Sequence, residues 1–147
     1  MTTKTNPKLQ VAIDCADPHT LVRFWAAVAG YEVEDHHDGV EQMIAAGYAS
    51  RDDAVEIGGR LQWATAAACF DPEGGRPRLL FQQVPEAKTV KDRIHLDLHF
   101  PAGGAAEVER IIGLGATRLW EGQQGPHTWV TLADPEGNEF CVSAAKS

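Results

Sequence analysis

The strongest constraint on the fold is an internal repeat. The segments "LQVAIDC" and "IHLDLHF" both alternate apolar and polar residues, as a β-strand with one buried face does. Aligning Gln10 with His95 gives an offset of 85 residues (95 − 10), and the same offset carries Gly30 onto Gly115. A repeat of this kind predicts one supersecondary unit that is built twice.

A helical pattern follows the first strand in each copy. In "DPHTLVRFWAAVAG", Asp17 can cap the helix, Pro18 suits its first position and Gly30 suits its end. Apolar residues recur three and four positions apart in both copies, as they do on a helix with one buried face. They are Leu21, Phe24, Trp25 and Val28 in the first copy, and Val108, Ile111 and Ile112 in the second.

Each copy ends in a strand, a turn and another strand. The turns "DPEGG" and "DPEGN" begin at Asp71 and Asp134 and are rich in turn-forming residues, and the last strands align through Phe81 and Phe140. The turns are 63 residues apart (134 − 71), so the first copy holds about 22 extra residues (85 − 63). These fall at about residues 34–59, where "VEQMIAAG" suggests a short helix.

These elements predict an α+β fold of two βαβββ modules, at about residues 8–84 and 93–145. Neither module can bury its sheet alone. We therefore expect residues 1–147 to form a single domain, in which the two sheets curve around a shared cleft and the helices lie outside. His95, Asp97 and His99 alternate with apolar residues, so their side chains should point into that cleft.

Composition and charge exclude several classes of partner. The net charge of −8 and the isoelectric point near 5.1 argue against nucleic acid, which would require a basic patch. No apolar run reaches the roughly 18–20 residues that span a membrane. The polar start "MTTKTNPKLQ" predicts a cytoplasmic protein. The three cysteines form no C-x-x-C pair, so neither a structural zinc site nor a redox centre of that kind is expected.

Four segments carry a resemblance to a known superfamily: "FWAAVAGYEV", "HLDLHF", "LGATRLW" and "WVTLADPEGNEFCV". Paired βαβββ modules with these motifs resemble the vicinal oxygen chelate superfamily, which includes glyoxalase I, bleomycin-resistance proteins, extradiol dioxygenases and methylmalonyl-CoA epimerases. The likeness is greatest to the glyoxalase-like proteins common in actinobacteria. It spans about residues 9–142 and implies the fold more directly than the reaction.

The resemblance also implies four metal-ligand positions, at Gln10, Gln82, His95 and Cys141. His95 matches, and glutamine serves at the Gln10 position in some glyoxalase I enzymes, whereas Gln82 and Cys141 depart from the pattern. Neutral amides do not neutralise a divalent ion, and the carboxylate base of the glyoxalase reaction is missing. We therefore expect no tightly held zinc, nickel or iron. The cofactor is then either none or a divalent metal in a differently built site, with His95 and Glu139 as ligands and Glu139 as the catalytic group.

The remaining polar candidates lie on the strands that should face the cleft. Asp97 and His99 share a face with His95, and Asp14 of the first module can join them in a hydrogen-bonded network or in a site for a ligand. Cys141 should face the same hollow, where it is either an inert small side chain or a ligand or nucleophile.

Aromatic and loop residues complete the candidate site. Trp63 and Trp129 are predicted on the third strands of the two modules, where they can wall a ligand or pack in the core. His127 should lie in a loop or at a strand start. His36 and His37 in the insertion should be exposed to solvent.

Two function classes follow. The first is a small-molecule binding protein of the bleomycin-resistance kind, which holds a metabolite or an antibiotic, aromatic or otherwise planar, in the cleft. The second is a metal-dependent lyase, isomerase or dioxygenase that uses His95 and Glu139. The missing carboxylates favour the first class. The resemblance further implies a homodimer.

Overall fold

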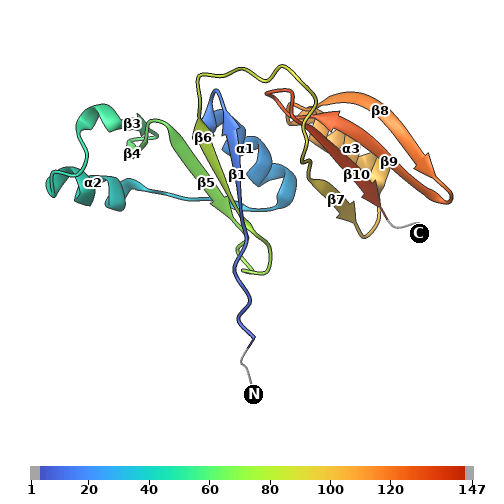
Figure 1. Cartoon of the computed structure of the whole chain (residues 1–147), viewed down its shortest axis with the longest axis horizontal. Coiled ribbons are helices and arrows are strands. Elements are labelled where there is room, and N and C mark those ends of the chain that lie inside the picture. Colours follow the sequence, from blue (N-terminus) through green and yellow to red (C-terminus); the bar gives the residue numbers. More distant parts are fainter. Residues whose placement is uncertain (1–3, 145–147) are drawn as a thin grey trace. The chain divides into compact units, whose positions relative to one another are not determined.

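The computed structural model describes residues 4–144, and the chain divides between Pro85 and Glu86 into two compact units (Figure 1). Each unit contains one copy of the repeat. Each copy folds as an α+β module with its own four-stranded sheet, so the predicted fold class is confirmed. That the two modules share one cleft stays a prediction. No helix in the described part of the chain is long and apolar enough to cross a membrane.

The first unit is a mixed sheet with one helix packed on it. Its elements are β1 (Gln10–Cys15), α1 (Pro18–Ala29), β2 (Glu32–Val33), β5 (Ala66–Phe70) and β6 (Arg78–Gln83). The strand order is β1-β6-β5-β2, with β1 parallel to β6, and α1 packs on β5 and β6. The Asp17 carboxylate accepts the Thr20 N–H at 3.2 Å, and Gly30 ends the helix in the left-handed region at φ 69°. The predicted start and end of α1 are therefore confirmed.

The insertion in the first module forms a helix and a separate two-stranded hairpin within the first unit. It contains α2 (His37–Ala45), the short 3₁₀ helix η1 (Arg51–Asp53) and the hairpin of β3 (Ala54–Ile57) with β4 (Arg60–Trp63). The predicted short helix is therefore present. Trp63 lies on β4, outside the four-stranded sheet, so its predicted place on the third strand of the module is wrong; that strand is β5.

The two histidines of the insertion are also not placed as predicted. His36 Nε2 lies 2.9 Å from a Glu34 carboxylate oxygen, and His37 Nδ1 accepts the Leu61 N–H at 2.8 Å. Both side chains are only about one-fifth exposed, 20% and 21%. The expectation that they are solvent exposed is wrong, because each imidazole is held by a nearby group: His36 by the Glu34 carboxylate, and His37 by the Leu61 N–H on β4.

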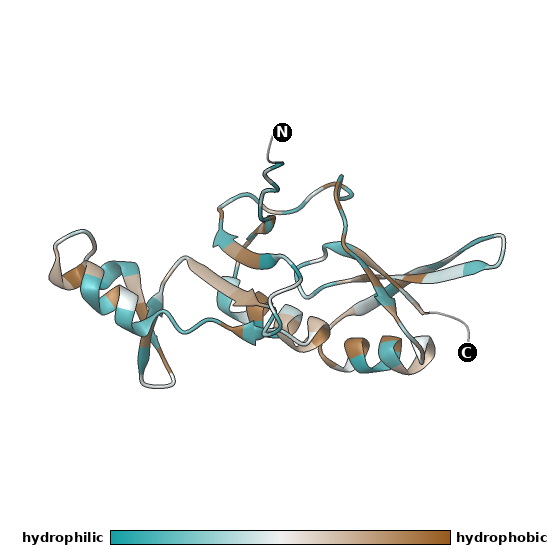
Figure 2. Ribbon diagram, turned by 90° about the horizontal axis from the view of Figure 1, so that it is seen from below, coloured by the Kyte–Doolittle hydropathy of each residue, from teal (hydrophilic) through white to brown (hydrophobic). Residues whose placement is uncertain are grey.

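The second unit repeats the topology of the first. Its elements are β7 (Asp97–Phe100), α3 (Gly104–Gly113), β8 (Thr117–Gln124), β9 (His127–Ala133) and β10 (Glu139–Ala144). The order β7-β10-β9-β8, with β7 parallel to β10, matches the first sheet strand for strand. α3 packs on β10 and carries both apolar and polar residues (Figure 2), as a helix with one buried face does. The core of this unit includes Val108, Ile111, Leu132, Phe140 and Val142.

Two details of the strands differ from the predictions. β7 begins at Asp97, and Ile94 is 83% exposed, so the predicted strand over "IHLDLHF" is shorter at its start. Ala12 and Asp97 are equivalent positions at the 85-residue offset of the repeat. Ala12 pairs with Leu80 and Asp97 pairs with Cys141, so Leu80 is the residue of the first module that corresponds to Cys141. The alignment through Phe81 and Phe140 is thus two residues off.

The two-residue shift between the last strands arises from the turns that precede them. The first module has "RP" at residues 76–77 between its turn and its last strand, and the second module has no counterpart. Both turns are otherwise built alike, because the buried Asp71 and Asp134 carboxylates each accept N–H groups of their own loop. Arg76 binds the Asp71 carboxylate and, with the loop N–H groups, lowers the pKa of Asp71 to about 2.

Candidate binding pocket in the second module

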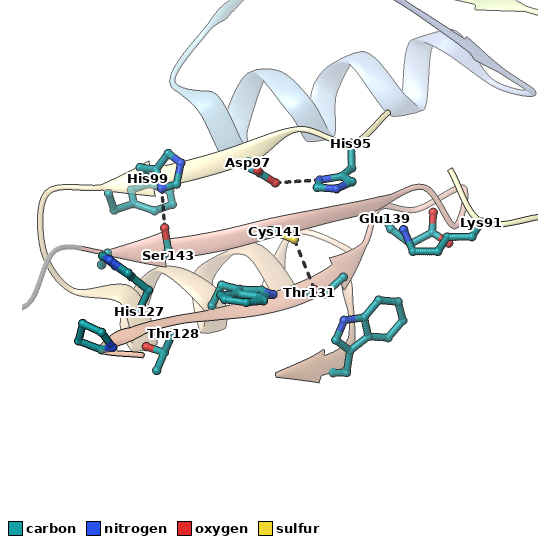
Figure 3. Close-up of a pocket in the computed structure, with 15 residues that line it drawn as sticks. Lys91, His95, Asp97, His99, His127, Thr128, Thr131, Glu139, Cys141 and Ser143 are labelled. Carbon is teal, nitrogen blue, oxygen red and sulfur yellow. Dashed lines mark hydrogen bonds and ion pairs between the residues drawn. The ribbon is translucent and has the colours of Figure 1, made fainter. Parts of the chain in front are cut away.

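A cavity of about 890 Å³ lies on the open face of the second sheet, the face opposite α3 (Figure 3). All of its lining residues belong to the second unit. The polar lining consists of Lys91, His95, Asp97, His99, His127, Thr128, Thr131, Glu139, Cys141 and Ser143. The apolar lining consists of Phe100, Trp120, Pro126, Trp129 and Ala144.

The alternation of the strands places the polar residues here. Asp97 and His99 on β7 are register partners of Cys141 and Ser143 on β10, and partners in a parallel pair present their side chains on the same face. Phe140 and Val142, which alternate with Cys141 and Ser143 along β10, are 1% and 2% exposed on the helix side. Two adjacent strands therefore supply the polar floor of the pocket.

Two hydrogen bonds order the floor. His95 Nδ1 lies 2.8 Å from Asp97 Oδ1, and His99 Nδ1 lies 2.6 Å from Ser143 Oγ (Figure 3). An ionised carboxylate only accepts, so the Nδ1–H of His95 donates to Asp97, which leaves Nε2 of His95 as an acceptor when the ring is neutral. The side chains of His95 and Asp97 are 39% and 48% exposed, so both remain accessible to a ligand.

Cys141 joins this floor from the middle of β10. Its Sγ lies 3.4 Å from the Oγ1 of Thr131, a residue that is 3% exposed. One ligating atom from each of His95, Asp97 and Cys141 lies within 4.8 Å of the other two. The strand register therefore brings an imidazole, a carboxylate and a thiol together.

Two indoles form the apolar side of the pocket, on the β8–β9 hairpin. Gly122 on β8 pairs with Trp129 on β9, and a Cβ added at Gly122 would lie only 2.2 Å from Cε2 of the Trp129 ring. The indole therefore lies flat across the glycine. Trp120 lines the same cavity and is 47% exposed, which leaves a large apolar surface open to a bound molecule.

Glu139 lies at the edge of the floor, held by the segment that precedes β7. Its carboxylate accepts from Lys88 Nζ at 3.2 Å and from the Asp92 N–H at 3.0 Å. Burial alone would raise the pKa of Glu139, but the N–H groups and the ammonium outweigh it and lower the pKa to about 2. The pKa of Asp92 is raised by burial and by the negative charge of Glu139.

The predicted site residues of the first module are not among the residues that line this cavity. Asp14 and Gln82 are register partners on β1 and β6, and both are exposed. Gln10 accepts a hydrogen bond from Arg78 at 2.8 Å, and the Trp63 carbonyl lies 2.7 Å from His19 Nε2. Their contribution to a ligand site stays a prediction.

Sequence reasoning missed several residues of the pocket. The side chains of Thr131 and Ser143 could have been found, because each shares a strand face with a residue already identified. Trp120 was harder to find, since a bulge between Arg118 and Trp120 shifts the register of β8.

Comparison with known proteins agrees with the fold. Residues 10–143 match the family model of a glyoxalase-like domain, so the chain belongs to the glyoxalase-like domain family, within the vicinal oxygen chelate superfamily. No curated protein matches the sequence.

Solved structures support the same fold at low sequence identity. A glyoxalase/bleomycin resistance protein/dioxygenase family enzyme from Burkholderia phytofirmans PsJN has a TM-score of 0.63 and 14% identity, over 93% of this chain and 97% of that one. A mutant of the fosfomycin resistance protein FosX from Listeria monocytogenes, complexed with Mn(II) and 1S,2S-dihydroxypropylphosphonic acid, has a TM-score of 0.63 and 10% identity, over 97% of this chain and 95% of that one. FosX from Mesorhizobium loti has a TM-score of 0.60 and 12% identity, over 97% and 94%.

The ligand positions implied by the superfamily do not suit a hard divalent ion in this chain. Leu80, which corresponds to Cys141 in the strand register, has no donor atom, and Gln10 and Gln82 offer only neutral amides. Cys141 replaces a carboxylate with a thiol. Of the four positions, only His95 and Cys141 provide strong ligands for a transition metal.

Proposed function

We propose that this protein binds a small planar or aromatic molecule, a metabolite or an antibiotic, in the pocket of the second module. The observation that carries the proposal is a cavity of about 890 Å³ with two indoles on one side and a hydrogen-bonding floor on the other. Small-molecule sites typically enclose about 300–1,000 Å³ and combine apolar walls with a few placed polar groups.

The chemistry of the lining favours a flat ligand with polar groups along one edge. Trp120 and Trp129 offer indole faces for stacking, which contributes about 0.5–1.5 kcal/mol per aromatic pair beyond the buried area. The Asp97 carboxylate can accept from a donor on the ligand. His99 and Ser143 can donate or accept. A ligand with both donors and acceptors on its polar edge would therefore satisfy the floor.

The solved structures add support at the level of the superfamily. The Listeria FosX mutant carries a small phosphonic acid with its Mn(II), and both FosX proteins are named for fosfomycin resistance. We infer that the present chain likewise handles a small molecule. We also infer a cytoplasmic homodimer, in keeping with the superfamily resemblance.

The second candidate is a metal-dependent lyase, isomerase or dioxygenase. The observation that favours it is the group of potential ligands formed by His95, Asp97 and Cys141. Against it stands the state of Glu139, the carboxylate predicted to be the catalytic group: a pKa of about 2 makes it a weak base, and Lys88 already occupies one of its oxygens. We therefore place binding ahead of proton-transfer catalysis.

The proposal is tested with a thermal-shift screen of planar aromatic compounds on metal-free protein. Compounds that raise the melting temperature are then titrated while tryptophan fluorescence is followed. Ligands that bind only the native state stabilise it by RT ln(1 + [L]/Kd), so a compound at 100 times its Kd adds about 2.7 kcal/mol. A binder should quench the emission of the pocket tryptophans.

Variants then separate the pocket from the rest of the fold. His95→Ala, Asp97→Asn and Trp129→Ala should each weaken binding, whereas Leu96→Ala, which removes a half-buried apolar side chain, should mainly lower the free energy of unfolding. Trp63→Phe in the first module serves as the tryptophan control. If the three pocket variants bind as the wild type does at equal folded fraction, the ligand site lies elsewhere and the proposal is wrong.

A further inference from the structure

We propose that the hydrogen bond between the imidazole of His37 and the backbone N–H of Leu61 is an acid-sensitive latch, which releases α2 from the β3–β4 hairpin when the ring takes up a proton. The latch belongs to the insertion of the first module. It goes beyond the proposed small-molecule site and does not depend on it, because the lining of that cavity comes from the second unit.

The hairpin presents the Leu61 N–H on the side of β4 that faces away from β3. Alternate residues of an antiparallel strand direct their N–H groups toward and away from the partner strand. The Ala64 N–H donates to the Asp53 carbonyl at 2.9 Å, so Leu61, three residues earlier, directs its N–H away from β3. His37 Nδ1 accepts this N–H at 2.8 Å. The latch therefore joins the first residue of α2 to the outer side of β4, beside which α2 lies (Figure 1).

The direction of this hydrogen bond fixes the protonation state of His37. A backbone N–H can only donate, so Nδ1 must hold a lone pair, and the neutral ring carries its proton on Nε2. Nε2 lies 3.4 Å from the Glu41 carboxylate on the next turn of α2. Protonation makes Nδ1 a second donor, and two N–H groups cannot bond to each other. The closed latch therefore requires the neutral imidazole.

α2 depends on the latch because its other anchors are weak. The helix spans nine residues, only Val40 of them is buried, and the N-cap residue His36 makes no side-chain hydrogen bond to the helix. Isolated helices of this length are unstable in water. Positive charge at a helix N-terminus is also unfavourable, so an imidazolium at His37 opposes the first turn. Protonation therefore removes the hydrogen bond and weakens the helix at the same position.

Carboxylates near His37 offer the protonated ring other partners. The charged side chains on the elements around it are Asp35, His36, Asp38, Glu41, Glu56 and Arg60. Asp35 accepts the His37 N–H at 3.1 Å and also binds Arg60 and Gln62 of β4. Gln62, the His37 N–H and Arg60 lower the pKa of Asp35 to about 2, so this carboxylate stays ionised when an imidazole titrates. The imidazolium can therefore turn from Leu61 toward Glu41 or Asp35.

His36 responds to acid in the opposite sense. Its Nε2 lies 2.9 Å from Glu34, whose pKa is lowered by Arg78 and, to a lesser extent, by His36. Protonation strengthens this contact, whereas protonation of His37 breaks the bond to Leu61. Histidine side chains ordinarily titrate between about pH 5 and 8. Because only the open form binds the proton on His37, the latch is closed above this range and is lost as the pH falls through it.

The first measurement follows the imidazole nitrogens of the full isotope-labelled chain by nuclear magnetic resonance. At about pH 7.5, the nitrogen shifts of His37 should show an unprotonated Nδ1 and a protonated Nε2. Hydrogen exchange of the Leu61 amide is then compared at about pH 7.5 and about pH 5.5, after correction for the intrinsic exchange rate. Its protection should fall roughly tenfold at the lower pH, which corresponds to about 1.4 kcal/mol.

Matched variants assign the effect to His37. In His37→Asn, the side-chain oxygen can take the place of Nδ1 as acceptor but does not titrate, so the Leu61 amide should stay protected at both pH values. His37→Ala removes the acceptor, and protection should be low at both. His36→Asn changes the neighbouring imidazole and should retain the pH response of the wild type. Circular dichroism checks that each variant is folded.

Three results would overturn the inference. They are a neutral His37 ring with its proton on Nδ1 at about pH 7.5, equal protection of the wild-type Leu61 amide at both pH values, and a pH response that survives in folded His37→Asn. The first two are measured on the wild-type chain, so a variant that fails to fold leaves the inference testable.

Discussion

Replacing Gly122 with alanine should move one wall of the pocket while leaving the sheet intact. An alanine Cβ would lie 2.2, 2.3 and 2.4 Å from Cε2, Cζ2 and Nε1 of Trp129, whereas carbon atoms in contact lie about 3.5–4.0 Å apart. The indole must therefore shift by at least about 1.3 Å (3.5 − 2.2). Gly122 lies in β8 and does not have a positive φ, so the backbone accepts alanine without strain.

The expected effect on folding is small and the effect on binding is larger. Alanine is favoured over glycine within a strand by about 0.5–1 kcal/mol, which offsets part of the packing lost when the half-buried Trp129 ring moves. A ligand that stacks on the indole should lose about 0.5–1.5 kcal/mol, a weakening of roughly 2- to 13-fold.

Near-ultraviolet circular dichroism should report the displaced ring, and fluorescence titration with a compound from the screen should report the affinity. Gly113→Ala is the matched control, because it lies in the same unit and an added Cβ there has no atom within 4 Å. Unchanged affinity in Gly122→Ala, together with an altered tryptophan spectrum, would refute the view that Trp129 walls the ligand.

Three further changes test the second module. Ile111→Ala removes a side chain with 0% exposure and should lower the free energy of unfolding in urea by about 2–5 kcal/mol, whereas Leu114→Ala, 40% exposed, should cost much less; equal losses would contradict the packing of α3. Asp134→Ala leaves two loop N–H groups, now bound at 2.8 and 3.0 Å, without their acceptor, and should cost about 1–3 kcal/mol by thermal unfolding. The pKa of Glu139 falls from 4.5 to about 2 on folding, so its contribution is complete above pH 4.5 and is lost as the pH falls toward 2. Glu139→Gln should flatten that part of a plot of melting temperature against pH. An unchanged slope would contradict the view that Lys88 and the Asp92 N–H lower the pKa of Glu139.

The sequence was sufficient for the topology because the topology is repeated. The 85-residue offset places α1 over residues 103–114, and α3 spans Gly104–Gly113. Caps and turns were also predictable, since Asp17, Asp71 and Asp134 act on N–H groups only two to five residues away. Local chemistry of this kind can be read from one stretch of chain.

The site was predicted less well because it depends on pairing between distant segments. Nothing in the spacing of Asp97 and Cys141 shows that they are neighbours; the parallel register makes them so. Because two extra residues precede β6, Leu80 and not Gln82 is the residue of the first module that corresponds to Cys141. Trp63 was misplaced because the β3–β4 hairpin takes up the chain on which the third strand was expected.

The position of β10 in its sheet has a consequence for the order in which the protein forms. β10 is the last strand of the second module to be synthesised, yet it lies between β7 and β9. Until it inserts, β7 has no strand partner, and Cys141 and Ser143 are absent from the pocket floor. The closing of the sheet and the completion of the site are therefore a single event. On the ribosome, a chain that stops before residue 139 would have a free β9 edge open to pairing with another molecule.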